Sequence, residues 1–97
     1  MKTEISEWIQ KDYNPFIIFD KNGKIVYLND EAEYLLSFIN YKDIFEFTIT
    51  NAKNKQGLFT TFGEYRFDKF EFGGVTIGYT NNEEIGIKLY KTLSFPK

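Results

Sequence analysis

Hydrophobic residues recur with a helical period at the start of the chain and with strand-like periods soon after it. In residues 3–12, Ile5, Trp8 and Ile9 fall on one face of a helix. Asn14-Pro15 follows, and the residue before a proline is pushed out of the helical backbone region. An isolated helix of this length is marginal in water. The pattern therefore predicts a short amphipathic helix that must dock on its own domain or on a second copy.

Two runs rich in β-branched and aromatic residues come next, PFIIFD (15–20) and KIVYLN (24–29). They flank Asn22-Gly23, a strong hairpin signal, because both residues tolerate the positive φ of a type I′ turn. Asp20 and Gly23 are assigned to this turn. The first run is almost entirely apolar, which favours a central strand buried on both faces.

Two helices are predicted after the hairpin. Asn29 or Asp30 caps the first, and Asp30 with Glu33 has the spacing of a capping box. Asp43 is the expected cap of the second helix, although the FTIT segment of this helix has the propensity of a strand. The apolar stripes that define the two helices are Ala32, Leu35, Leu36 and Ile39 in the first, and Phe45, Thr48, Ile49 and Ala52 in the second.

The rest of the chain, after the polar loop NAKNKQG, is rich in strand-forming residues. Its apolar alternation changes phase at Asp68-Lys69 and again at Gly73-Gly74. We interpret the first change as a turn between two strands and the second as a β-bulge or bend. TNNEE forms another turn, and IGIKLYKTL closes the sheet. The order predicts an α+β domain: a helix, two strands, two helices and three strands.

The composition indicates one globular domain, residues 1–97, with a bulky core. Of the 97 residues, 20% are aromatic, and these fit the half-buried surface of strands. The sequence contains neither His nor Cys. Metal centres built on Cys or His, nucleophiles paired with His, disulfides and thiol redox chemistry are therefore excluded. A chain without Cys is compatible with a cytoplasmic location, which we expect.

Charge and hydropathy disfavour two classes of partner, nucleic acid and membrane. The net charge is −2 and Arg66 is the single arginine, whereas nucleic-acid proteins usually present a basic face. Aromatic residues that could stack on bases alternate with acidic ones; the aromatic set is Tyr65, Phe67 and Phe70, and the acidic set is Glu64, Asp68 and Glu71. No apolar run approaches the roughly 20 residues of a membrane span.

Catalysis would have to depend on carboxylates, lysine or tyrosine. Asp20, Asp43 or Glu46 could serve as a base if it were buried beside Tyr34 or Tyr41, because desolvation raises the pKa of a carboxyl group. Each has a simpler role, in a turn, at a helix cap or in solvent. No spacing singles out a pair, so we expect the chain not to be an enzyme.

The segment NPFIIFDKNGKIVYLNDEAEYLL resembles the start of a PAS domain, and the resemblance extends over residues 15–93. It implies a five-stranded antiparallel sheet in the order 2-1-5-4-3 with short helices on one face. GEYRFDKFEF would form the third and fourth strands. The family's ligand pocket lies between helices and sheet, and Asn29 would turn the chain so that its helix forms a pocket wall.

The resemblance also implies which residues would line that pocket. The abundance of Phe and Tyr favours a small or filled pocket over a large cofactor cavity. The candidate pocket residues are Ile17, Phe19, Tyr34, Leu35, Phe38, Phe45, Phe47, Ile49 and Ile77.

As a PAS-like module, the chain is expected to act in signal transduction, for example in a histidine kinase, without catalysing a reaction. It would act by binding a small ligand, by dimerisation or by both. A scaffold without ligand is the alternative. Haem, a covalent flavin adduct and a cinnamoyl chromophore are disfavoured because their usual His or Cys is missing; a non-covalent flavin or small metabolite stays open. The expected partners are a second copy, through Ile5, Trp8 and Ile9, and an effector domain. Lys91-Thr92-Leu93 replaces the family's frequent Asp-Ile-Thr, which puts the usual output coupling in doubt.

Overall fold

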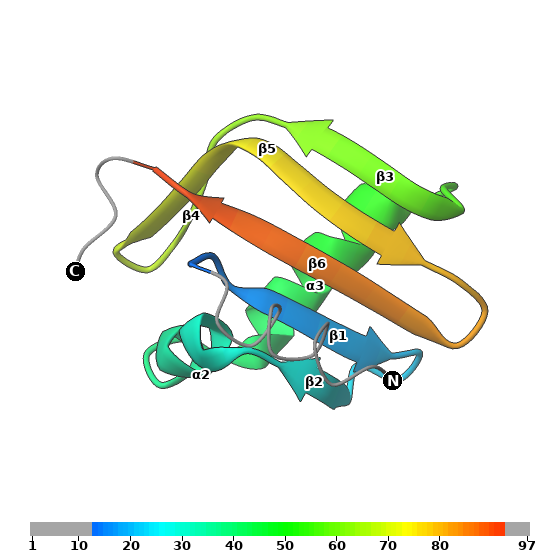
Figure 1. Cartoon of the computed structure of the whole chain (residues 1–97), viewed down its shortest axis with the longest axis horizontal. Coiled ribbons are helices and arrows are strands. Elements are labelled where there is room, and N and C mark those ends of the chain that lie inside the picture. The colour runs from blue at the N-terminus through cyan, green and yellow to red at the C-terminus, as the bar shows by residue number, and fades with distance from the viewer. Residues whose placement is uncertain (1–12, 93–97) are drawn as a thin grey trace.

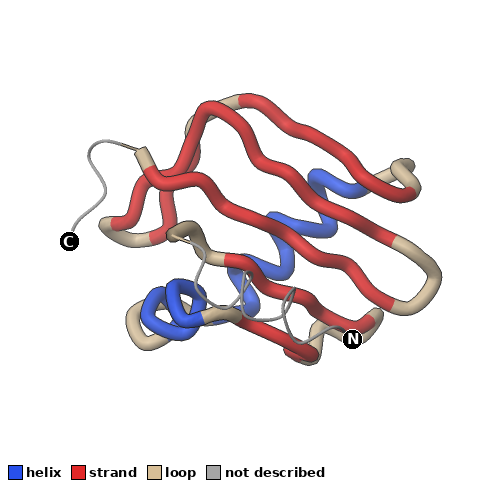
Figure 2. Tube along the Cα trace, viewed as in Figure 1, coloured by secondary structure: helices blue, strands red, loops and turns tan. Residues whose placement is uncertain are grey.

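The computed structural model describes residues 13–92, so the expected helix at 3–12 and its apolar stripe lie outside the described residues. The described chain is an α+β domain with an antiparallel sheet and two helices (Figures 1 and 2). The elements in order are β1 (Phe16–Asp20), β2 (Ile25–Leu28), α2 (Asp30–Leu36), α3 (Tyr41–Ala52), β3 (Gly57–Phe62), β4 (Tyr65–Phe67), β5 (Phe70–Thr80) and β6 (Glu84–Lys91).

The strands are arranged in the order β2-β1-β6-β5-β3, and β4 pairs with β5. All of these pairings are antiparallel. α3 crosses the back of the sheet in Figure 1 and contacts β5 and β6, whereas α2 contacts β1. No helix of residues 13–92 therefore covers the front face of the sheet.

The segment from 57 to 80 forms one long hairpin. β3 and β4 pair with β5 in the same register, and the break between them, Gly63-Glu64, lies opposite Gly73-Gly74. The turn falls at Asp68-Lys69, as predicted, and Asp68 has a φ of 55°. We expected three strands after the helices and five in all; residues 13–92 contain six because this break divides the segment 57–67 into β3 and β4.

Gly73-Gly74 lies in a bulge, as predicted, but the bulge does not change the face of the strand. Phe72 pairs with Lys91 and Thr76 with Leu89, so four steps along β5 match two steps along β6. Two extra residues preserve the alternation, whereas one would reverse it. Thr76 therefore shares the helix side with Phe72, and Ile77 faces the opposite side. The expectation that Ile77 faces a pocket between helices and sheet was wrong.

The β1–β2 hairpin is present, but its turn is not type I′. Gly23 has a φ of 87°, and Asn22 is not among the residues with positive φ, which a type I′ turn would require. The Gly23 amide donates to Asp20 O (3.1 Å) and the Asp20 amide to Lys24 O (2.8 Å). This is a turn followed by a glycine bulge. Within β1, Ile17 and Phe19 are buried while their neighbours are half-buried, so the strand is not buried on both faces.

The helix caps differ partly from the prediction. Asn29 caps α2, accepting from the Ala32 amide, so Asp30 and Glu33 do not form the capping box. Asn40 caps α3, and Asp43 lies in its first turn.

α3 is helical despite its FTIT segment, and Thr48 and Ala52 are buried as expected, but Ile44 is buried in place of Phe45 and Ile49. Ile44, Thr48 and Ala52 are buried, whereas Phe45 is half-buried and Ile49 is 44% exposed. This rotation brings Phe45 and Ile49 to the surface beside the two turns described below.

Candidate functional site

Aromatic side chains fill the space between the helices and the hairpin formed by β4 and β5. Phe38 packs against Phe70 with ring centroids 5.4 Å apart. Phe67 packs between Phe47 (5.5 Å) and Phe72 (6.1 Å). Phe70 and Phe72 are fully buried. These five residues form an aromatic cluster between the helices and the β4–β5 hairpin, the region where the resemblance leads us to expect a ligand pocket.

Asn29 fixes the corner where β2 passes into α2. Its fully buried side chain accepts hydrogen bonds from the Phe16 amide (3.0 Å) and the Ala32 amide (2.9 Å), and donates to Asn14 O (2.9 Å). One amide group therefore joins the start of β1, the cap of α2 and the segment before β1. Its role is structural, as the assignment of Asn29 to a sharp turn predicted.

An open groove lies beside α3 at the end of the sheet. Phe45 and Ile49 line both of its hollows, which have volumes of about 210 Å³ and 300 Å³. The further lining of the smaller hollow is Asp20, Lys21, Thr80, Asn81, Glu84 and Ile85, and that of the larger is Asn22, Gly23, Tyr41, Lys42 and Glu46. The groove thus combines an apolar floor with a polar rim.

Two turns with side-chain hydrogen bonds form the walls of this groove. Asp20 Oδ1 accepts from the amides of Asn22 (2.8 Å) and Lys24 (2.9 Å). Asn81 Oδ1 accepts from the amides of Glu83 and Glu84, both at 2.7 Å. Each turn is therefore held by a carboxylate or amide oxygen that binds two backbone amides.

Gly23 fixes the distance between the first turn and the floor of the groove. A Cβ atom at Gly23 would lie 3.0 Å from the Phe45 ring. The ring centroids of Phe45 and Phe19 are 5.1 Å apart, in an edge-on contact. Positive φ and close approach both require glycine here. Phe45 is consequently held in place from two sides.

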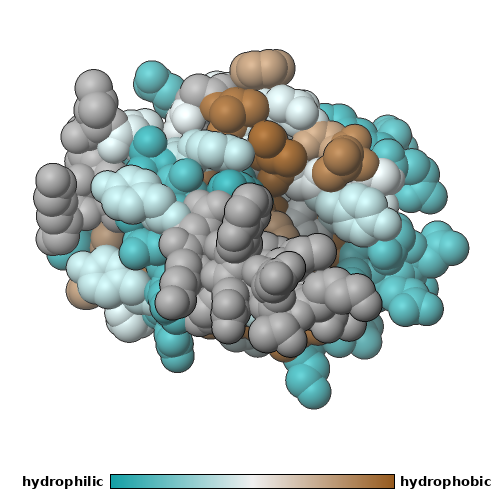
Figure 3. All heavy atoms as spheres, viewed as in Figure 1, coloured by the Kyte–Doolittle hydropathy of each residue, from teal (hydrophilic) through white to brown (hydrophobic). Residues whose placement is uncertain are grey.

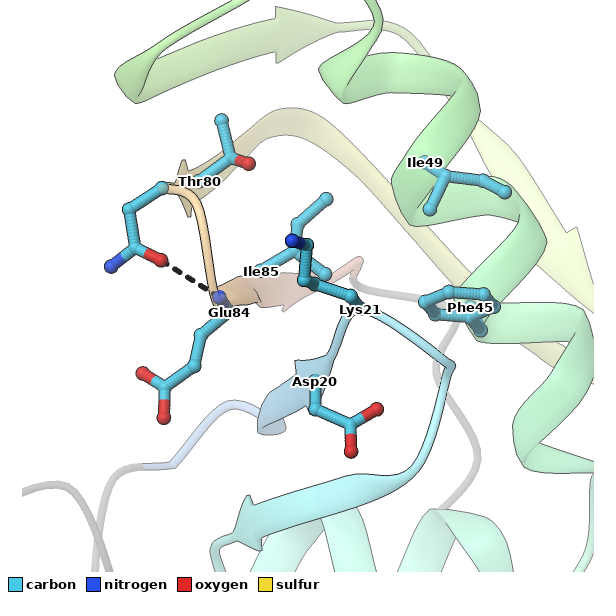
Figure 4. A pocket seen from close by; sticks show the side chains of 8 residues that line it. Asp20, Lys21, Phe45, Ile49, Thr80, Glu84 and Ile85 are labelled. Atoms are coloured by element: carbon cyan, nitrogen blue, oxygen red, sulfur yellow. Dashed lines mark hydrogen bonds between the residues drawn. The ribbon is translucent and has the colours of Figure 1, made fainter.

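Figure 4 shows how the charged side chains lie around the smaller hollow. The Lys21 side chain rises from its turn into the space between Thr80 and Phe45, while the carboxylate of Glu84 points away from Phe45. Asp20 and Glu84 are directly opposite each other in the β1–β6 pairing. The hollow therefore combines the apolar side chains of Phe45, Ile49 and Ile85 with the charged side chain of Lys21.

None of the three carboxylates considered as a catalytic base, Asp20, Asp43 and Glu46, is fully buried. Asp20 Oδ1 is occupied by the turn, and Asp43 and Glu46 are exposed on α3. Within the described residues, no group of three or more acidic side chains could hold a metal ion. The pKa of Tyr27 is raised, mainly because burial disfavours the phenolate and also because Asp30 is negatively charged. Tyr27 lies on β2, outside the groove lining.

The structure distributes the remaining pocket candidates among different environments. Ile17, Phe19 and Leu35 are fully buried in the core, and Tyr34 and Phe38 are about half-exposed and contact each other edge-on at 5.2 Å. Phe47 is in the aromatic cluster. Only Phe45 and Ile49 of the nine candidates line the groove.

Several groove residues were not among the candidates that we took from the sequence, notably Lys21, Asn81, Glu84 and Ile85. Both turns were expected, but nothing local indicates that they meet. They lie side by side because β1 pairs with β6, which joins residues more than sixty positions apart in the chain.

No helix within residues 13–92 is both long and apolar enough to cross a membrane. Comparisons with protein-family models, with curated proteins and with solved structures found no significant match to this chain.

Proposed function

We propose that this domain is a non-catalytic regulatory module of the PAS type, which acts by binding and shape change in a signalling protein such as a histidine kinase. The observation that carries the proposal is the register of the long hairpin. If β3 and β4 are counted as one strand, because they pair with β5 in one register, the order β2-β1-β6-β5-β3 becomes 2-1-5-4-3. A helix crosses one face of this sheet, as the resemblance implies.

The groove beside Phe45 and Ile49 is the ligand site in this proposal. The aromatic cluster packs between the helices and the β4–β5 hairpin, so we place the ligand at the surface groove. The two hollows suit a small ligand with an apolar part over Phe45 and Ile49 and polar groups at the rim.

Native and denaturing mass spectra of the purified protein test this function. A mass excess that disappears on denaturation indicates a bound small ligand. It should be lost in Ile49→Glu, which introduces a charge between the two hollows. It should be kept in Val26→Glu, a matched control, since Val26 is 52% exposed on β2. A bare chain mass in the wild-type protein would contradict the ligand-binding form of the proposal.

The filled interior favours a second candidate, a PAS-like scaffold that works without a ligand by contacting other proteins. The close packing of Phe38, Phe47, Phe67, Phe70 and Phe72 is the specific observation for it. A bare chain mass together with a stable complex with an effector domain would support this form.

A further inference from the structure

The free edge of β3 is an exposed and unusually unprotected strand. β3 ends the strand order, and no element of the described chain pairs with its outer edge. Its sequence, GLFTTF, contains no charged residue and no proline, and its pairing with β5 shows no irregularity. Edge strands usually carry charges, prolines or bulges that prevent pairing with another chain. β3 has none of these features.

The other edge of the sheet is protected more effectively. β2 has only four residues, and its pairing with β1 is irregular between Ile18 and Phe19. Short strands and bulges are common protections of an edge. The contrast indicates that β3 is the edge at which pairing with another chain is favoured.

Large apolar side chains stand beside this edge on the face opposite α3. Leu58 and Phe62 are each 77% exposed, the highest values among the large hydrophobic residues described. Tyr79, on the neighbouring β5, is 45% exposed, and Figure 3 shows hydrophobic side chains gathered over β3 and β5 on this face. A strand added at the edge would cover part of this surface.

We propose that β3 pairs with β3 of a second copy, antiparallel and centred on Thr60, to join two sheets into one. In this register Leu58 lies opposite Phe62 of the second copy, Phe62 opposite its Leu58, and Thr60 opposite its Thr60. Directly opposite side chains keep the same face, and aliphatic–aromatic and Thr–Thr pairs are favourable neighbours across strands. The strand is therefore complementary to itself about a twofold axis.

Charges next to the strand agree with an antiparallel arrangement. Lys55 precedes β3 and its ammonium lies 5.3 Å from the Phe59 ring, whereas Glu64 follows β3. Antiparallel pairing places the basic end of each strand beside the acidic end of the other. A parallel pairing would bring like charges together at both ends.

The surface area buried in the contact sets the expected affinity of the dimer. Two six-residue strands bury less than the roughly 1,000 Å² that a stable interface needs. The dimer should therefore be weak and depend on concentration. Because no residue of β3 lines the groove, the pairing does not depend on whether the groove binds a ligand.

Sedimentation velocity tests the proposal. The concentration range should extend to about 1 mM, close to the dissociation constants of weak complexes. The wild-type chain should dimerise reversibly. Thr60→Lys places two ammonium groups opposite each other and should weaken the dimer by about tenfold or more. Thr60 is exposed in the monomer, so the fold, checked by circular dichroism, should be unchanged. The control Val26→Lys adds the same charge at the β2 edge and should leave the dimer intact.

A cross-linking experiment supplies a second measurement. The chain has no Cys, so Thr60→Cys introduces a single thiol on the twofold axis. It should form a disulfide-linked dimer under mild oxidation, whereas Val26→Cys should not. A wild-type chain that stays monomeric at 1 mM, a dimer insensitive to Thr60→Lys, or equal effects at positions 26 and 60 would overturn the proposal.

Discussion

Single polar residues at corners of the chain decide how the elements meet. Asn29 is fully buried and makes three side-chain hydrogen bonds, whereas Asn40, the corresponding cap of α3, is exposed and accepts from the Lys42 amide. The two asparagines therefore have the same capping role, but Asn29 also joins its helix to other segments of the chain.

Asn29→Ala should lower the free energy of unfolding by about 2–4 kcal/mol, because it leaves the part-buried amide of Phe16 and the buried amide of Ala32 without their acceptor. Asn40→Ala removes one exposed cap and should cost about 1 kcal/mol or less. Urea denaturation of both variants measures the difference. Similar losses of unfolding free energy in the two variants would mean that the hydrogen bonds of Asn29 add no stability beyond its cap of α2.

At the level of elements, local sequence predicted which segments form strands and helices but not all of their orientations. The hairpin at Gly23, the cap at Asn29 and the turn at Asp68-Lys69 follow from residue preferences that act over a few positions. The buried face of α3 does not, because Ile44 and Ile49 are equally apolar and only packing against the sheet selects Ile44.

Local sequence is also insufficient to predict the orientation of β5 and the lining of the groove. A bulge can be predicted from Gly73-Gly74, but whether it adds one residue or two depends on the pairing with β6, and this decides which way Ile77 faces. Phe45 and Ile49 could be selected as candidates from their apolar character. The polar rim could not, since it requires the two turns to meet through the β1–β6 pairing.

That pairing also places like charges opposite each other, since Asp20 faces Glu84. Glu84→Lys replaces two opposed carboxylates with a pair of opposite charge and should stabilise the domain by about 0.5 kcal/mol at low salt. The gain should shrink in high salt because the charges are near the surface. The control Glu83→Lys makes the same change of charge in the exposed turn. An equal gain in that variant would assign the effect to net charge and not to the pair.

At the scale of the whole molecule, β6 unites two parts that are separate in sequence. It pairs with β1 on one side and β5 on the other. The β1–β2 hairpin and the hairpin from 57 to 80 each form locally, but the sheet is complete only when β6 lies between them. Because the β1–β6 pairs are far apart in the chain, the domain is expected to fold more slowly than helical proteins of its size.

The filled interior leads to a prediction about the molecule as a binding protein. Phe72 is fully buried in the aromatic cluster. Phe72→Ala should cost about 3–5 kcal/mol, because it removes a large side chain and leaves a cavity. A small apolar molecule such as benzene should restore part of this loss, since a dry apolar cavity binds such ligands and binding stabilises the folded state.

Thermal unfolding with and without benzene measures this effect. The melting temperature of the Phe72→Ala variant should rise with benzene and that of the wild-type chain should not. Phe72→Leu, which removes less volume, keeps the test possible if the alanine variant does not fold, because domains of this kind are stable by only about 5–15 kcal/mol. If benzene stabilised the wild-type chain as much as the variant, the native interior would already contain space for a ligand. The ligand site would then be sought among Phe38, Phe47 and Phe70, and not at the groove beside Phe45.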